Sequence, residues 1–194
     1  MRDHIARQIA EAQRLMATML NDSALLASLQ STAEACIVSL SKGGEILLAG
    51  NGGSAANAQH VAGEFAGRLA FDRPSLPAIG LTTNSSLLTA VGNDYGFETL
   101  FARQVRALGN KGDVFIGYSV SGKSANVLRE FEQAEAKDMV CVGLTGSPGG
   151  SMQQLCDFLI QVPAVETPKI QEGHLVLGHI ICGLVESAMF KALK

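Results

Sequence analysis

Tryptophan is absent from this chain of 194 residues, and aromatic residues make up only 5% of it. The core must therefore be built mainly from aliphatic side chains, as is typical of domains in which short strands alternate with helices. Cations are also few, because 15 Lys and Arg stand against 18 Asp and Glu, for a formal net charge of −3. This balance argues against a nucleic-acid-binding surface dominated by Lys and Arg.

Cysteine is scarce too, with four residues and no C-x-x-C spacing. We interpret them as small buried hydrophobes in a reducing compartment, not as disulfides or a zinc ribbon. The N-terminal stretch does not combine a basic start, an apolar core and a small-residue cleavage site. We also find no apolar run long enough to span a bilayer. These observations lead us to expect a cytoplasmic protein with no membrane partner.

A chain of this length fits one domain, which we expect to cover residues 1–194. Residues 43–194 show short aliphatic segments separated by helical stretches, a pattern that predicts a mainly parallel sheet with helices on both faces. The last helix is expected at about Ile170–Leu193. The predicted strands are Ile46–Ala49, Ala78–Leu81, Asp113–Tyr118, Val140–Leu144 and Phe158–Val162.

Two helices are predicted within residues 1–42, before the first strand, because apolar positions recur there at helical spacing. The apolar faces of these two helices must be buried against some other surface. They pack either on their own sheet or against the same helices of another subunit.

The segment Asn51-Gly52-Gly53-Ser54 joins a predicted strand to a predicted helix. A glycine turn at the start of a helix offers backbone N–H groups and the positive helix end to a phosphate. The spacing matches neither the P-loop nor the dinucleotide-binding pattern. Taken alone, the segment is best interpreted as a tight turn that binds nothing.

A second loop of the same design, Ser119-Val120-Ser121-Gly122-Lys123-Ser124, follows the predicted strand Asp113–Tyr118. Its hydroxyl and N–H donors suit a phosphate that is held but not transferred. Ser124 alone would be an ordinary helix cap. Two such loops at the carboxyl edge of one parallel sheet favour a sugar phosphate or a similar ligand.

His60 and Glu64 are four residues apart on the helix predicted after the first loop, so they share one face. Such a pair permits a shared metal, or a base beside a partner that tunes it, although it is also common on solvated faces. Gln171 and His179 lie about 80° apart around the last helix and about 12 Å apart along it. They can meet one ligand only by reaching toward each other, through a bent helix start, or across a subunit boundary. His174 points elsewhere and is expected to serve packing or a surface contact.

Four motifs occur in one order along the chain: Asn51-Gly52-Gly53-Ser54, Gly92-Asn93-Asp94-Tyr95-Gly96, the loop Ser119–Ser124, and Ile170-Gln171-Glu172. Together they resemble the SIS (sugar isomerase) domain and, more closely, the bacterial sedoheptulose-7-phosphate isomerases, over nearly the whole chain. The resemblance implies a flavodoxin-like α/β fold and a homotetramer. It also implies conversion of sedoheptulose 7-phosphate to D-glycero-D-manno-heptose 7-phosphate, the first step toward the heptose of bacterial lipopolysaccharide.

The resemblance also implies roles for individual residues. Glu64 and His179 would be the acid/base pair, and a zinc ion would be bound by His60, Glu64, Gln171 and His179. Substrate contacts would come from Asn51, Gly52, Gly53, Glu64, Asn93, Asp94, Ser119, Val120, Ser121, Ser124 and Gln171.

Two positions depart from the family pattern. Val120 stands where the family usually has Thr, and Asn57 stands where Asp is common.

Because Gln171 and His179 are far apart on a straight helix, we expect a site built at a subunit interface. At least one of Glu64, Gln171 and His179 would then come from a neighbouring chain.

A non-catalytic relative with the same fold, the bacterial DnaA-initiator-associating protein, is the alternative. Residues 73–79 and 104–109 resemble that branch as well. Glu64 and His179 favour the enzyme, since the non-catalytic branch lacks an acid/base pair at these places. A sugar-phosphate-sensing regulatory domain is a third class, but no helix-turn-helix segment or basic arm is evident.

Overall fold

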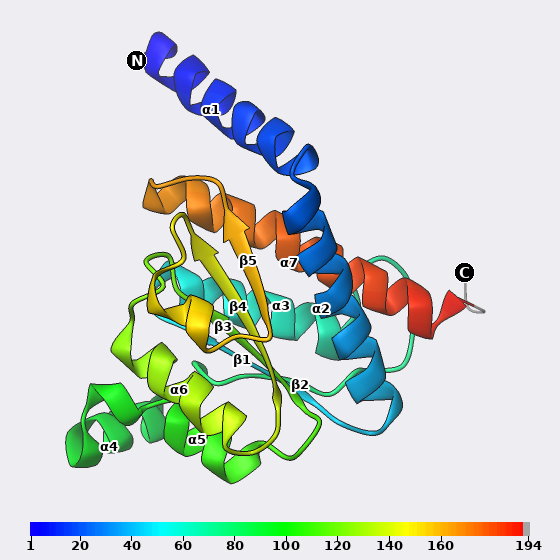
Figure 1. Cartoon of the computed structure of the whole chain (residues 1–194), viewed down its shortest axis with the longest axis vertical. Helices are drawn as coiled ribbons and strands as arrows, with labels where there is room; N and C mark the ends of the chain where they lie inside the picture. Colours follow the sequence, from blue (N-terminus) through cyan, green and yellow to red (C-terminus); the bar gives the residue numbers. More distant parts are fainter. Residues whose placement is uncertain (192–194) are drawn as a thin grey trace.

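The structure is a computed structural model that describes residues 1–191 (Figure 1), so the end of the predicted last helix lies outside the described residues. The strands are β1 (Ile46–Gly50), β2 (Ala78–Gly80), β3 (Val114–Tyr118), β4 (Val140–Gly146) and β5 (Phe158–Val162). The α-helices are α1 (Arg2–Leu20), α2 (Ser23–Ser41), α3 (Gly53–Ala66), α4 (Ser85–Tyr95), α5 (Ala102–Leu108), α6 (Ala125–Glu135) and α7 (Thr167–Met189). Two short 3₁₀ helices, η1 (Phe97–Thr99) and η2 (Gly150–Gln154), complete the order.

All five strands are parallel and follow the spatial order β2-β1-β3-β4-β5. This is the flavodoxin-like order, and it confirms the predicted α/β fold. From β1 the chain moves outward to β2, and from β3 it moves the opposite way through β4 to β5. The carboxyl ends of β1 and β3 therefore flank the point where the strand order reverses, which is where open parallel sheets bind ligands.

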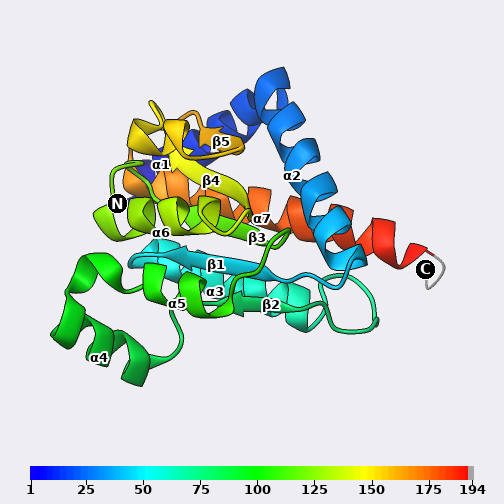
Figure 2. The same ribbon diagram turned by 60° about the horizontal axis from the view of Figure 1, so that its bottom comes forward.

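Alternate residues of each strand face opposite sides of the sheet. In β1, Ile46 and Leu48 join the core beneath α2, α3 and α7, whereas Leu47 and Ala49 join the core beneath α5 and α6. Figure 2 shows these helical layers on the two faces. A strand that is buried on both faces is a nearly continuous run of apolar residues, and this pattern allowed the strands to be located in the sequence.

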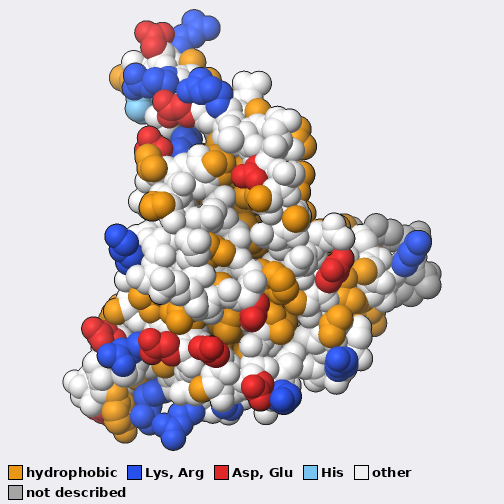
Figure 3. All heavy atoms as spheres, viewed as in Figure 1, with side chains coloured by type: hydrophobic (Ala, Val, Ile, Leu, Met, Phe, Trp, Pro, Cys, Tyr) orange, Lys and Arg blue, Asp and Glu red, His pale blue; other side chains and the backbone are white. Residues whose placement is uncertain are grey.

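The two leading helices differ in how far they are buried. One side of α2 packs on α7 and β5, so this helix covers its own sheet. In contrast, α1 projects from the body (Figure 1), and its Ile5 and Ile9 side chains are 58% and 65% exposed. Apolar side chains are also visible along this limb of the molecule in Figure 3. Within the described part of the chain, the N-terminal half of this face is therefore left uncovered, whereas Leu15 and Met19 near its C-terminal end are buried in the core.

The expectation that no apolar run could span a bilayer needs correction. By length and composition alone, the helix Ser23–Ser41 could cross a membrane, with a mean hydropathy of 1.3 over 18 of its residues. However, Leu25, Leu29 and Cys36 of this helix are buried in the core. The contacts of α2 with α7 and β5 account for the apolar residues on its buried side, whereas Leu26 and Val38 on its other side are 45% and 52% exposed.

The buried residue His174 packs in the core, which decides between the two roles expected for it. Its ring stacks edge-on against Tyr118 with 5.7 Å between centroids, and it has no solvent exposure. Neither ring nitrogen has a hydrogen-bond partner among the described residues. Burial lowers the pKa of the imidazole to about 4.

We predict that His174 makes the protein acid-sensitive. The unfolded chain takes up this proton near pH 6.5 but the folded chain only near pH 4, so the unfolded state binds more protons in this window. Stability is therefore undiminished above pH 6.5 and falls, by at most about 3 kcal/mol, as pH drops toward 4. Denaturant unfolding of a His174→Phe variant should show a flatter profile between these pH values, and an unchanged profile would contradict the assignment.

Candidate active site

The two loops singled out in the sequence meet at the carboxyl ends of β1 and β3. Between them lies a cavity of about 410 Å³. The start of α7 closes one side of it, through Thr167 and Gln171. The rest of the lining is Asn51, Gly52, Gly53, Ser54, Tyr118, Ser119, Val120, Ser121 and Ser124. Eight of the predicted substrate-contacting residues thus share one cavity: Asn51, Gly52, Gly53, Ser119, Val120, Ser121, Ser124 and Gln171.

The first loop depends on its two glycines. Gly52 has φ = +56°, a left-handed conformation that glycine adopts without steric cost. Gly53 begins α3, and a Cβ there would overlap the side-chain amide of Gln171. This close approach places Gln171 and the N-terminus of α3 together at the cavity.

The second loop gathers hydroxyl groups. Ser124 occupies the N-cap position of α6, but its side chain makes no capping hydrogen bond. Its Oγ instead lies 2.9 Å from the Oγ of Ser119. Ser121 accepts a hydrogen bond from the N–H of Lys123 at 3.2 Å and is itself exposed. Ser124 is therefore the N-cap residue by position, but its hydroxyl does not cap the helix and is directed toward Ser119.

A pair of amides joins the two loops. The side chains of Asn51 and Asn126 donate to each other, at 2.8 Å in both directions. Asn126 is only 2% exposed, and its Oδ1 also accepts the N–H of Val127. Asn126 lies two residues after the second loop, and nothing in the sequence indicated that it would bridge to the first loop. Asn51 thus fixes the cavity wall as well as lining it.

A second cluster lies further along α3 and α7. The Nε2 atoms of His60 and His179 are 2.7 Å apart, and Nε2 of His60 is 3.4 Å from Oε1 of Glu64. One ligand atom from each of the three residues lies within 4.8 Å of the others. The side chains of His60 and Glu64 are 46% and 21% exposed, so the cluster is open to solvent.

This cluster answers one part of the expectation drawn from helix spacing, namely whether Glu64 and His179 can meet without a neighbouring chain. His179 meets His60 and Glu64 within one chain because α3 and α7 run side by side in the same direction. Gln171, two turns earlier on α7, lies against Gly53 instead. The separation along α7 therefore divides the residues between the cavity and the cluster, and Glu64 and His179 need no neighbouring chain to meet.

The donor set of the cluster fits a metal ion. Two imidazole nitrogens and a carboxylate form a familiar ligand set for catalytic zinc, in which a further position stays open to water or substrate. Ligands about 2.0–2.1 Å from a tetrahedral zinc ion stand roughly 3.3 Å apart. The two imidazole nitrogens, now 2.7 Å apart, would therefore need to separate, while ligand atoms near the 4.8 Å limit would need to approach.

Two other predicted residues lie elsewhere. Asn93 and Asp94 are exposed near the end of α4, where the Asn93 amide donates to the Asp94 carboxylate. Neither residue lines the cavity between the two loops. Contact of Asn93 and Asp94 with the substrate therefore stays a prediction, because neither residue reaches this cavity within one chain.

Asn57, the second departure from the family pattern, lies between the two regions. Its side-chain nitrogen donates to the carbonyl of Gln171 at 3.2 Å. This hydrogen bond joins α3 to the start of α7. The ionised Asp that is common at this position in the family could not donate it, because a carboxylate only accepts hydrogen bonds.

The fold and the two-loop cavity define a class of protein, and comparison with known families agrees. The sequence profile of the SIS domain matches residues 9–146, so the chain belongs to the SIS-domain proteins. Curated relatives that match almost the whole chain narrow the assignment. With identities of up to 66% to them, the chain belongs to the phosphoheptose isomerase family.

Three relatives illustrate the match. The chain is 66% identical to the phosphoheptose isomerase of Burkholderia pseudomallei (strain 1710b), over 96% of this chain and 95% of the relative. It is 52% identical to the enzyme of Aneurinibacillus thermoaerophilus, over 98% and 96%. The solved structure of phosphoheptose isomerase GmhA from Neisseria gonorrhoeae superposes with a TM-score of 0.90 at 41% identity, covering 96% of this chain and 98% of that one. These relatives give no support to the DnaA-associating alternative.

Proposed function

We propose that this protein is an aldose–ketose isomerase that converts sedoheptulose 7-phosphate to D-glycero-D-manno-heptose 7-phosphate. The observation that carries the proposal is the placement of a His–Glu–His cluster and an oxyanion-binding cavity on the same two helices. Gly53 at the cavity and His60 in the cluster are about 10 Å apart along α3. A seven-carbon sugar can therefore keep its terminal phosphate between the loops while its carbonyl end reaches the cluster. Formation of the aldose from sedoheptulose 7-phosphate by the purified protein tests the proposal.

The reaction moves a proton between adjacent carbons through an enediol. We propose that the Glu64 carboxylate takes the proton from the carbon beside the carbonyl and returns it to the neighbouring carbon. His179 moves the proton between the two oxygens. The 3.4 Å approach of His60 to Glu64 holds the carboxylate beside the imidazole pair.

A zinc ion bound by His60, Glu64 and His179 would polarise the carbonyl and stabilise the oxyanion that forms. The family resemblance adds Gln171 as a fourth ligand. In this structure Gln171 contacts Gly53, so its role as a ligand is the least supported of the four.

We expect Ser121 and Ser124 to hold the phosphate with the N-terminus of α6. Ser121→Ala and Ser124→Ala should each weaken substrate binding by about 1–3 kcal/mol, because each removes a charge-assisted hydrogen bond. Steady-state kinetics should show a raised KM with kcat largely preserved. A fall in kcat with unchanged KM would place the phosphate elsewhere, as at Asn51–Ser54.

We further propose that the whole chain is one SIS domain and assembles as a cytoplasmic homotetramer. The exposed side chains of Ile5 and Ile9 on α1 support assembly, since a neighbouring chain could cover them. The four free cysteines support a reducing compartment. The product would supply heptose for bacterial lipopolysaccharide.

Subunit mixing separates a site within one chain from a shared one. Because Glu64 and His179 meet within one chain, a mixture of Glu64→Gln and His179→Gln proteins should stay inactive after subunit exchange. Mass spectrometry would verify the exchange, and a mixture of wild-type and His179→Gln subunits serves as the control. Recovered activity in the double-mutant mixture would show that the pair is completed between chains.

A further inference from the structure

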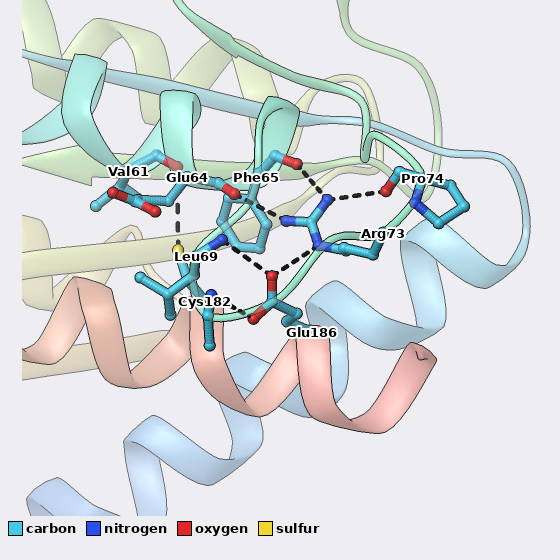
Figure 4. Close-up of polar contacts among 9 residues, drawn as sticks. Val61, Glu64, Phe65, Leu69, Arg73, Pro74, Cys182 and Glu186 are labelled. Atoms are coloured by element: carbon cyan, nitrogen blue, oxygen red, sulfur yellow. Dashed lines mark hydrogen bonds and ion pairs between the residues drawn. The ribbon is translucent and has the colours of Figure 1, made fainter. Parts of the chain in front are cut away.

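A buried ion pair lies directly beyond the His–Glu–His cluster. Nε of Arg73 donates to Oε1 of Glu186 at 2.9 Å, and both side chains are 1% exposed. The Glu186 carboxylate also accepts the N–H groups of Leu69 and Ala70, each at 2.9 Å. Burial opposes ionisation of Glu186, but these N–H groups and Arg73 together lower its pKa below the ordinary value. Both side chains are therefore charged, and both oxygens of the Glu186 carboxylate accept hydrogen bonds (Figure 4).

The remaining donors of Arg73 hold the end of α3. Its Nη2 donates to the carbonyl of Glu64 at 2.8 Å, and its Nη1 donates to the carbonyl of Phe65 at 2.9 Å. These carbonyls belong to the last turn of α3, which ends at Ala66 and lacks a complete set of intrahelical partners. A cation there also complements the negative end of the helix dipole.

The pair thus connects the two helices that carry the cluster. Arg73 bonds the backbone of Glu64 itself, while Glu186 lies on α7 seven residues, or about two turns, after His179. The helices also approach closely between these points, where the Cys182 thiol lies 3.9 Å from the Val61 carbonyl. A shift of α3 along or away from α7 would change the distance between Glu64 and His179 directly.

We propose that Arg73 and Glu186 are positioning residues for the isomerase reaction, setting the spacing of Glu64 and His60 against His179. This inference rests on the proposed function for its catalytic consequence. Its structural consequence, a preformed metal site, stands independently. Arginine is required because its planar guanidinium reaches the Glu186 carboxylate and three backbone carbonyls at once, those of Glu64, Phe65 and Pro74, whereas the lysine ammonium is a single point donor.

The test uses Arg73→Lys and Glu186→Gln in the full-length protein, and both substitutions preserve most of the side-chain volume. We expect the affinity of metal-free protein for Zn²⁺, measured by calorimetry, to fall about 10-fold or more, and kcat to fall by a similar factor. KM for the sugar phosphate should stay near the wild-type value, because the phosphate cavity lies at the other end of α3 and α7.

Asp113→Asn provides the matched control. Asp113 is also buried, at 3% exposure, and its carboxylate accepts the N–H groups of Glu45 and Asn110 next to the amino end of β3. This variant should lose thermal stability without losing zinc affinity or kcat. The proposal is overturned if the folded Arg73 and Glu186 variants keep wild-type zinc affinity, or if Asp113→Asn lowers it equally. Should the wild-type protein show no isomerase activity, the proposed function fails, and the zinc affinities still decide the positioning role.

Discussion

Replacement of Glu64 by glutamine should lower kcat by roughly 10²–10⁴-fold, the usual contribution of a general acid or base. Glutamine has nearly the same shape as glutamate but cannot take a proton from carbon. His179→Gln should cause a loss of the same order, because proton transfer between the two oxygens then lacks its carrier. Steady-state kinetics, with circular dichroism and a mass measurement of the assembly, would show whether the fold and the oligomer survive.

Glu172→Gln is the matched control for the Glu64 variant. Glu172 lies on α7 and pairs with Lys169 at 3.0 Å, outside both the cavity and the cluster. Its substitution should leave kcat near the wild-type value. Wild-type turnover in either the Glu64 or the His179 variant would remove that residue from the mechanism.

Arg73→Ala should produce the largest loss of stability, about 3–5 kcal/mol in the free energy of unfolding. It leaves the Glu186 carboxylate buried without its cation and removes donors from the Glu64 and Phe65 carbonyls. Urea unfolding would measure the loss. Lys111→Ala is the control, since the Lys111–Asp138 pair is 81% and 70% exposed and contributes little. Equal effects of the two substitutions would contradict the importance of the buried pair.

Glu186 should also make the stability of the wild-type protein fall at acidic pH. Since its pKa is lowered in the folded state, the unfolded state binds the proton more readily, and stability rises with pH through this range. The contribution is fully present above the ordinary glutamate pKa and is lost as pH falls through the lowered value.

Most of the fold could be predicted because its signals are local. The five strands are short, mainly aliphatic runs, and each prediction falls within a few residues of the observed strand. Helix type was harder to predict: Glu98 lies in the 3₁₀ turn η1, and α5 starts only at Ala102. The stretch Ser151–Leu155 is likewise mostly 3₁₀. Periodicity does not distinguish one tight turn of helix from another.

The same distinction between local and long-range signals applies to the site. Both loops carry glycine and hydroxyl patterns that report their own local geometry, so the cavity could be expected from the sequence. The meeting of His60 with His179 could not, because it depends on the direction and spacing of α3 and α7. The Asn51–Asn126 bridge and the Arg73–Glu186 pair join residues 75 and 113 positions apart. No local pattern encodes such contacts.

The most direct test of the account is an isomerase assay with sedoheptulose 7-phosphate, using protein stripped of metal and the same protein after addition of zinc. The aldose product should form with the restored protein and should be nearly undetectable with the stripped protein. The Glu64→Gln variant should remain inactive with zinc present. Absence of product from fully folded, zinc-restored wild-type protein would contradict the proposed function.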